Sequence, residues 1–208
     1  MAPNKNSKTP KRKSKSNKTM FLAIGLIAII LVGVGAYIAF GQPSKQSFPP
    51  TKVLLQTTAG NITIDLRTDK PITSGNFKTL VEQGKYDGTI FHRVIAGFMI
   101  QGGQVNGSVA TIPDETGSNN RNLPYTIAMA KTSEPNSATS EFFINVADNG
   151  QKYAPSFDAT YTVFGTVISG KDVVDKIANA PVTENPYIHG EMSVPVNPIT
   201  VIKASIVP

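Results

Sequence analysis

The stretch from Phe91 to Gly103, FHRVIAGFMIQGG, most constrains the fold of this chain. Apolar residues flank Ala96-Gly97, and a glycine-containing turn between two apolar runs predicts two short strands in a hairpin. Along the second strand, the period of two places Met99 and Gln101 on one face and Phe98 on the other. The pattern alone is equally typical of a core hairpin that carries one surface arginine.

The hairpin also carries three side chains of different chemistry: the cation Arg93, the apolar Phe98 and the amide Gln101. They can meet only if the sheet bends, and the glycines at positions 97, 102 and 103 permit such a bend. A Met-Ala pair at 129–130 and the run FFIN at 142–145 follow, and they favour a binding site over a plain hairpin.

Four motifs in this order resemble the cyclophilin-type peptidyl-prolyl isomerases: FHRVIAGFMIQGG, the Met-Ala pair, PNSATSEFFIN at 135–145 and YTVFGTV at 161–167. The resemblance covers roughly residues 52–207. It implies an eight-stranded antiparallel β-barrel with two capping α-helices. It also implies an enzyme that accelerates rotation of X-Pro bonds in proline-containing polypeptides and uses no cofactor or metal.

The N-terminal part of the chain predicts a membrane anchor. Residues 1–19 hold seven Lys or Arg residues and no acid, and residues 20–40 are 21 residues without charge. At about 1.5 Å per residue, such a helix spans roughly 30 Å, enough to cross a bilayer core. The basic flank predicts a cytoplasmic tail and an extracytoplasmic C-terminal domain.

A cleaved signal peptide is the alternative, because small residues such as Gly35 and Ala36 could form a cleavage site and release a secreted protein. The apolar core of a signal is usually about 7–15 residues, so the longer run favours an uncleaved anchor.

The remaining 13 basic and 14 acidic residues nearly cancel, so the formal net charge of +6 comes from the tail. The domain therefore has no basic face for nucleic acid.

Residues 41–51 are polar and contain three prolines, which predicts a linker, and residues 52–208 then form one domain. One helix is predicted from Pro71 to Gly84 and another from about 171 to 178. The proline-rich residues 179–197 have no motif and are expected to form a surface loop rather than a partner site.

Many short strands and two helices predict a closed β-barrel whose ends the helices cover. The predicted strands are 53–58, 61–66, the two arms within 90–101, 125–131, 141–146, 161–168 and 199–206.

The chemistry of amide rotation suggests a role for Arg93. Rotation is opposed by about 18–20 kcal/mol, because the nitrogen lone pair is delocalised into the carbonyl. The two X-Pro isomers differ by only about 0.5–1 kcal/mol, so a catalyst must stabilise the twisted amide rather than either isomer. A fixed arginine that donates a hydrogen bond to the pyramidal nitrogen does this without a nucleophile or metal.

The resemblance assigns the remaining site residues. Arg93 matches the catalytic arginine, Gln101 the residue that binds the substrate backbone, and Ala130 with Lys131 the segment along which the peptide lies extended. From the pattern alone, Arg93 would be a surface ion pair, Gln101 a surface amide and the apolar residues ordinary core. The residues that the resemblance places around the proline ring are Phe98, Met99 and Phe143, with Phe157 and Tyr161 as the far wall.

The chain departs from the family pattern at three positions in or near this site, one of which, Glu141, is also expected to contact the substrate. Glu141 stands where many relatives carry Gln, and this acid could pair with Arg93 or tune substrate preference. Tyr161 replaces a His of eukaryotic relatives. Ser156 replaces the Trp with which those relatives grip cyclosporin, and the chain has no Trp, so we expect weak cyclosporin affinity.

Other chemistries have little support in the sequence. His92 is expected to be structural rather than catalytic. Metal binding is disfavoured, because the chain has no Cys and its two histidines, His92 and His189, lie 97 positions apart. No nucleotide-binding or serine-hydrolase motif occurs.

The leading hypothesis is a membrane-tethered, monomeric prolyl isomerase that assists protein folding outside the cytoplasmic membrane. The alternative is a membrane-tethered chaperone or scaffold that binds proline peptides with little catalysis. A nucleic-acid-binding protein is a weaker third hypothesis, because the apolar run separates the basic tail from the domain.

Overall fold

The computed structural model describes residues 48–117, 119–154 and 156–208. The predicted tail, the predicted membrane span and most of the predicted linker lie outside the described residues. Within those ranges, none of the helices combines the length and the apolar character that a bilayer crossing requires.

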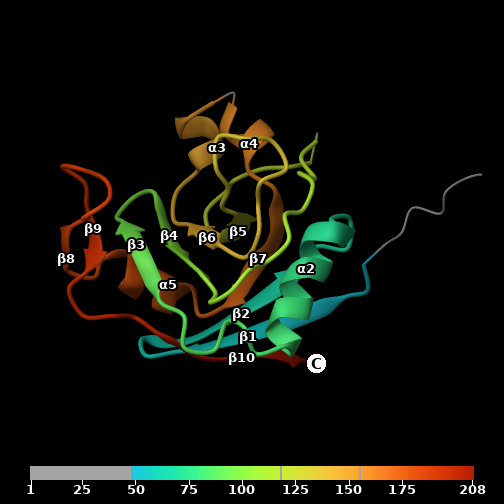
Figure 1. Ribbon diagram of the computed structural model, residues 1–208, viewed down its shortest axis with the longest axis horizontal. Helices are drawn as coiled ribbons and strands as arrows, with labels where there is room; N and C mark the ends of the chain where they lie inside the picture. Colours follow the sequence, from blue (N-terminus) through green and yellow to red (C-terminus); the bar gives the residue numbers. More distant parts are fainter. Residues whose placement is uncertain (1–47, 118, 155) are drawn as a thin grey trace, which may run out of the picture. The chain divides into compact units, whose positions relative to one another are not determined.

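Eight strands form one antiparallel sheet in the order β10-β1-β2-β7-β5-β6-β4-β3, and β8 and β9 form a separate hairpin (Figure 1). This confirms the predicted mainly β fold. The strands are β1 Thr51–Thr57, β2 Gly60–Leu66, β3 Phe91–Ile95, β4 Met99–Gly102, β5 Thr126–Met129, β6 Phe142–Asn145, β7 Val163–Ser169, β8 Val182–Glu184, β9 Met192–Pro195 and β10 Val201–Val207.

Two helices cover the sheet at the places that the apolar spacing predicts. Helix α2 (Pro71–Glu82) has proline in its first turn, where no intrahelical N–H bond is lost, and it packs against β7 and β10. Helix α5 (Lys171–Ala178) packs against β2, β3 and β4. Two short helices, α3 (Asn149–Lys152) and α4 (Ser156–Thr160), were not predicted.

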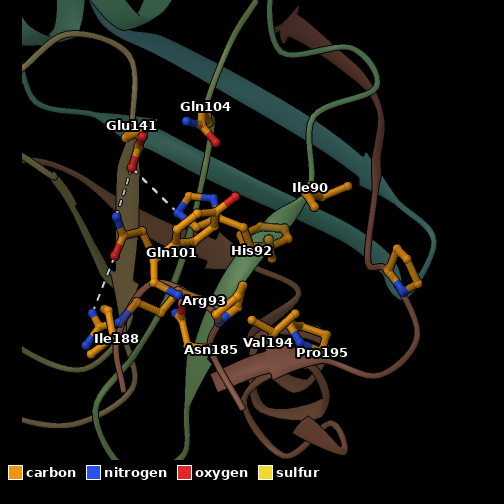
Figure 2. A pocket seen from close by; sticks show the side chains of 14 residues that line it. Ile90, His92, Arg93, Gln101, Gln104, Glu141, Asn185, Ile188, Val194 and Pro195 are labelled. Carbon is orange, nitrogen blue, oxygen red and sulfur yellow. Dashed lines mark hydrogen bonds and ion pairs between the residues drawn. The ribbon is translucent and has the colours of Figure 1, made fainter. Parts of the chain in front are cut away.

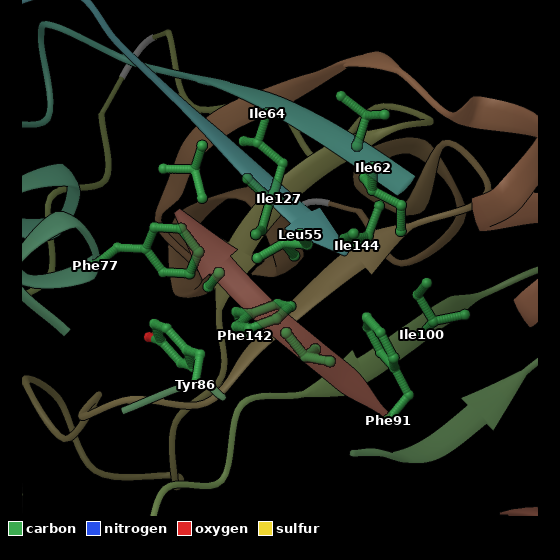
Figure 3. Packing of buried hydrophobic residues seen from close by; sticks show 14 of the residues in the cluster. Leu55, Ile62, Ile64, Phe77, Tyr86, Phe91, Ile100, Ile127, Phe142 and Ile144 are labelled. Carbon is green, nitrogen blue, oxygen red and sulfur yellow. The ribbon is translucent and has the colours of Figure 1, made fainter. Parts of the chain in front are cut away.

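The main core lies between the sheet and the helices α2 and α5, and it combines aliphatic side chains with a group of packed aromatic rings (Figure 3). The Phe77 ring of α2 stacks near Tyr86, Phe142 and Phe164, with ring centroids 4.9, 5.6 and 5.1 Å away. The buried Tyr86 hydroxyl donates to the carbonyl of Ser140 over 2.9 Å, so no polar group is left unpaired by this burial. The core therefore fixes β6, which carries the predicted site residue Phe143 and directly follows Glu141.

The predicted closed barrel is wrong in one respect, because the curled sheet ends at two edge strands, β10 and β3. The segments just before these strands meet at one isolated bridge, between Ile90 and Thr200. Gly88 adopts a left-handed φ of 80°, and Pro198 has no N–H to donate to a strand ladder. The Gly88 N–H still donates to the Val201 carbonyl over 2.8 Å, so the two edges touch at a few backbone hydrogen bonds without forming a continuous ladder.

The 179–197 segment, which was expected to be a surface loop, contains the β8–β9 hairpin. Asn185 organises its turn: its side chain accepts a 2.9 Å hydrogen bond from the Tyr187 N–H, and its own N–H donates 2.7 Å to the Glu191 carbonyl. Strand β9 packs against β3, beside the first arm of the FHRVIAGFMIQGG hairpin. The segment therefore brings new side chains to the predicted site.

Candidate active site

The β3–β4 hairpin brings Arg93 and Gln101 together by register. The two residues are direct cross-strand partners, so their side chains project from the same face. Gly97 adopts a φ of 68° in the turn, and the Phe98 N–H donates to the Ile95 carbonyl over 3.1 Å. Because Phe98 lies in the turn, before β4 begins, strand alternation does not keep it away from Gln101.

A cavity of about 160 Å³ lies beside this hairpin. Nine of the ten predicted site residues line it; the tenth, Glu141, lines an adjoining cavity of about 200 Å³ together with Gln101, Ala130 and Lys131. The nine are Arg93, Phe98, Met99, Gln101, Ala130, Lys131, Phe143, Phe157 and Tyr161.

Aromatic rings from three elements build the apolar wall of the smaller cavity. Phe143 of β6 meets Tyr161 edge-on with a centroid distance of 5.4 Å, and Phe157 of α4 lies 5.9 Å from Phe98 and 6.0 Å from Phe143. Met99 and Phe143 are almost fully buried in a cluster separate from the main core. These residues therefore pack as core residues do and also line the cavity.

Arg93 is held by a carboxylate that the sequence did not point to. Its Nε and Nη2 donate to the two carboxylate oxygens of Glu191, each over 2.7 Å. These hydrogen bonds from Arg93 lower the pKa of Glu191 to about 2. The Nη1 of Arg93 lies 3.5 Å from the Gln101 Oε1, and the guanidinium carbon lies 6.0 Å from the centre of the Phe98 ring.

Two roles were expected for Glu141, and the first of them, an ion pair with Arg93, is wrong. Glu141 instead accepts a 2.9 Å hydrogen bond from the Gln101 Nε2, and Figure 2 shows it between Gln101 and His92. The reason is positional: Glu141 directly precedes β6, whose pairing with β4 brings it beside Gln101, whereas the β8–β9 hairpin places Glu191 on Arg93. Glu191 lies 98 residues from Arg93 in a segment without a motif, so no local signal marked it.

The Ala130–Lys131 segment forms the shared rim of the two cavities. The Ala130 N–H donates to the Glu141 carbonyl over 2.9 Å, which fixes the segment to β6. The Lys131 side chain is 6 % exposed and its Nζ lies 2.6 Å from Asp114. The ion pair with Asp114 engages this side chain. A ligand at the rim would therefore contact the backbone of Lys131.

His92 does not line the cavity that holds Phe98 and Met99. Burial, together with the nearby Arg93, lowers its pKa, although Glu141 opposes this, so the imidazole is neutral at pH 7. Its Nε2 is 3.6 Å from Glu141, and its buried Nδ1 has no hydrogen-bond partner among the described residues. These contacts assign the ring no catalytic role, and the structural role of His92 stays a prediction.

This chain is similar in sequence to known proteins over most of its length. The family model described as "Cyclophilin type peptidyl-prolyl cis-trans isomerase/CLD" matches residues 52–206. A peptidyl-prolyl cis-trans isomerase of Acinetobacter baylyi is 46% identical over 170 residues, which are 78% of this chain and 89% of that protein. Peptidyl-prolyl cis-trans isomerase A of Dickeya dadantii is 46% identical over 175 residues, which are 80% of this chain and 90% of that protein.

Solved structures show the same fold. A cyclophilin type peptidyl-prolyl cis-trans isomerase of Cryptosporidium parvum superposes with a TM-score of 0.66 at 25% identity and covers 76% of this chain and 98% of its own. The same protein crystallised in the presence of the dipeptide Ala-Pro gives a TM-score of 0.65 at 26% identity, with coverage of 76% and 99%.

Proposed function

This chain belongs to the cyclophilin-type peptidyl-prolyl cis-trans isomerases, and on that premise we propose that Arg93 catalyses rotation of an X-Pro bond seated in the 160 Å³ cavity. The enzyme acts on proline-containing polypeptides. The observation that carries the proposal is the position of Arg93, whose Nε and Nη2 are engaged by Glu191 while Nη1 makes only a long contact with Gln101.

The proline ring would enter the apolar cavity between Phe98, Met99 and Phe143. As the amide twists, its nitrogen becomes pyramidal and more basic, and Nη1 of Arg93 would donate a hydrogen bond to it. This bond is stronger in the twisted state than in either planar isomer, so it lowers the barrier rather than only binding the substrate.

Gln101 would hold the substrate backbone on the same face. One N–H of its amide is engaged by Glu141 over 2.9 Å, which leaves the second N–H for a substrate carbonyl. Glu141 would thus orient the amide rather than act on Arg93. The polypeptide would continue along the Ala130–Lys131 rim as an added extended strand.

The proposal is tested by NMR exchange on a short Ala-Pro peptide with the full-length protein. The wild type accelerates cis–trans exchange, and Arg93→Ala is expected to remove most of that acceleration while the peptide still binds. Arg67→Ala is a matched control, because Arg67 is also an ion-paired arginine with 22 % of its side chain exposed, against 23 % for Arg93. If the wild type binds the peptide but does not speed exchange, the chain is a peptide-binding chaperone or scaffold instead.

We also propose that residues 20–40 anchor the enzyme in the membrane with the isomerase domain outside the cytoplasm. The uncharged run and its basic flank support this. A tether raises the enzyme's concentration near polypeptides emerging from the membrane, whose prolines otherwise isomerise in roughly 10–100 s.

The anchor is tested in a bacterial host that expresses the full-length chain. An uncleaved anchor keeps the protein in membranes after an alkaline carbonate wash, and added protease digests the domain in spheroplasts. A shortened, soluble product with a new N-terminus near residues 35–36 would instead show a cleaved signal and a secreted protein.

A further inference from the structure

A third and larger cavity of about 490 Å³ lies between β3 and the β8–β9 hairpin (Figure 2). Its walls are mostly apolar: Ile90 and Phe91 come from the β3 side, Ile188 from the hairpin turn, and Val194 and Pro195 from β9. None of these residues was predicted to form a site. The cavity exists because the 179–197 segment folds into a hairpin against β3.

The rim of this cavity exposes large apolar side chains to solvent. Tyr187 is 94 % exposed and Ile188 is 43 % exposed, while Ile90 on the opposite side is 41 % exposed. Asn185 holds the Tyr187 backbone in place through a 2.9 Å hydrogen bond, so this exposure belongs to an ordered turn. Contiguous exposed apolar surface around a hollow is typical of a binding site.

This cavity adjoins the proposed proline site. Arg93 and Gln101 line both, and Glu141 lines this cavity and the 200 Å³ one. A polypeptide whose proline lies against Phe98 and Met99 therefore has the 490 Å³ cavity on the other side of the wall that Arg93 and Gln101 form. An extended chain advances about 3.3 Å per residue, so the side chains that could enter this cavity belong to residues close in sequence to the proline.

We propose that this cavity binds a large aliphatic or aromatic side chain of the client polypeptide, close in sequence to its proline. The inference rests on the proposed function, since it assigns a second contact of the same bound chain. The β8–β9 hairpin thereby gives the enzyme a preference for apolar segments, as found in unfolded proteins. Acidic side chains are disfavoured at this position because the mostly apolar lining would bury a carboxylate without hydrogen-bond partners.

The test measures dissociation constants by calorimetry with the full-length protein. The ligands are Ala-Pro peptides in which one flanking residue at a time is Ala, Leu or Asp. At one position Leu is expected to bind about tenfold more tightly than Ala, the effect of burying most of an aliphatic side chain. Asp at that position is expected to bind more weakly than Ala.

Two variants locate the effect. Ile188→Asp places a carboxylate at the exposed rim and is expected to remove the Leu preference without changing affinity for the all-Ala peptide. Ile168→Asp is the matched control, because Ile168 on β7 is 49 % exposed and lies outside the residues that line this cavity, and it should keep the preference.

Equal binding of the Ala and Leu peptides at every position would overturn the inference, as would a Leu preference that survives Ile188→Asp. Concentration-dependent dimerisation in sedimentation velocity, lost in Ile188→Asp, would also overturn it and assign the cavity to a second copy of the chain. Exchange rates on the all-Ala peptide report separately on the proposed function. A wild type that prefers Leu but does not accelerate exchange would refute only the catalytic proposal.

Discussion

Replacing Glu191 by alanine is expected to lower kcat for Ala-Pro exchange about tenfold and to leave KM nearly unchanged. Glu191 accepts two 2.7 Å hydrogen bonds from Arg93 and thereby fixes one orientation of the guanidinium. An arginine side chain carries about 2 kcal/mol of rotamer entropy, and the substitution frees most of it. The long contact to Gln101 and the Phe98 ring retain the remainder.

The tenfold figure follows from this balance. If fixing the orientation of the Arg93 side chain again costs about 1.4 kcal/mol in the transition state, the activation free energy rises by that amount and the rate falls by a factor of about ten. Removing the carboxylate also leaves the charge of Arg93 unbalanced, which would strengthen its hydrogen bond to the amide nitrogen. Amide rotation creates no net charge, so we expect this strengthening to be smaller than the loss from disordering the guanidinium. The KM is set by the apolar cavity, which Glu191 does not line.

The assay is NMR exchange at several peptide concentrations, which separates kcat from KM. Glu191→Gln is the matched variant, because one amide oxygen can accept from only one side of the guanidinium; its kcat should lie between those of Glu191→Ala and the wild type. A kcat for Glu191→Ala equal to or above the wild-type value would refute the reasoning, since the ion pair would then restrain the enzyme rather than orient its arginine.

Three further predictions concern stability and binding. The pKa of Glu191 is lowered to about 2 in the folded protein, against 4.5 as the ordinary value, so its ion pair adds stability above pH 4.5 that is lost as the pH falls towards 2. In urea titrations across that range, Glu191→Gln should therefore show a shallower loss of unfolding free energy than the wild type, and equal slopes would contradict this. Gly103→Ala should cost at least about 1–3 kcal/mol, because the residue has a φ of 78° and an added Cβ would lie 2.6 Å from the Phe142 ring; an unchanged urea midpoint would contradict it. Cyclosporin should bind weakly because Ser156 offers no indole, and calorimetry that gives a nanomolar dissociation constant would disprove this.

The sequence predicted the parts of the site that follow from local pattern. The period of two in FHRVIAGFMIQGG indicated a hairpin, and its register makes Arg93 and Gln101 cross-strand partners. The position of Phe98 depends on the turn at Gly97, whose φ of 68° follows from the glycine itself. Family resemblance, rather than periodicity, supplied the roles of Phe143, Phe157 and Tyr161.

Other parts could not be predicted because they depend on long-range packing. Strands β8 and β9 are three and four residues long and β9 ends in a proline, so their periodicity is too short to distinguish from a loop. The Arg93–Glu191 pair joins residues 98 positions apart and forms only once that hairpin packs on β3. The open edge between β3 and β10 likewise depends on how the segments containing Gly88 and Pro198 approach each other in space.

The most direct test of the account compares Arg93→Lys with Arg93→Ala and the wild type on one Ala-Pro peptide. Lysine keeps the positive charge but lacks the planar guanidinium. In arginine, the edge with Nε and Nη2 binds Glu191 while Nη1 remains for the substrate. We expect both variants to bind the peptide with nearly wild-type affinity and to lose most of the exchange acceleration. Wild-type acceleration by Arg93→Lys would show that any cation suffices, and wild-type acceleration by Arg93→Ala would contradict the central role of this arginine.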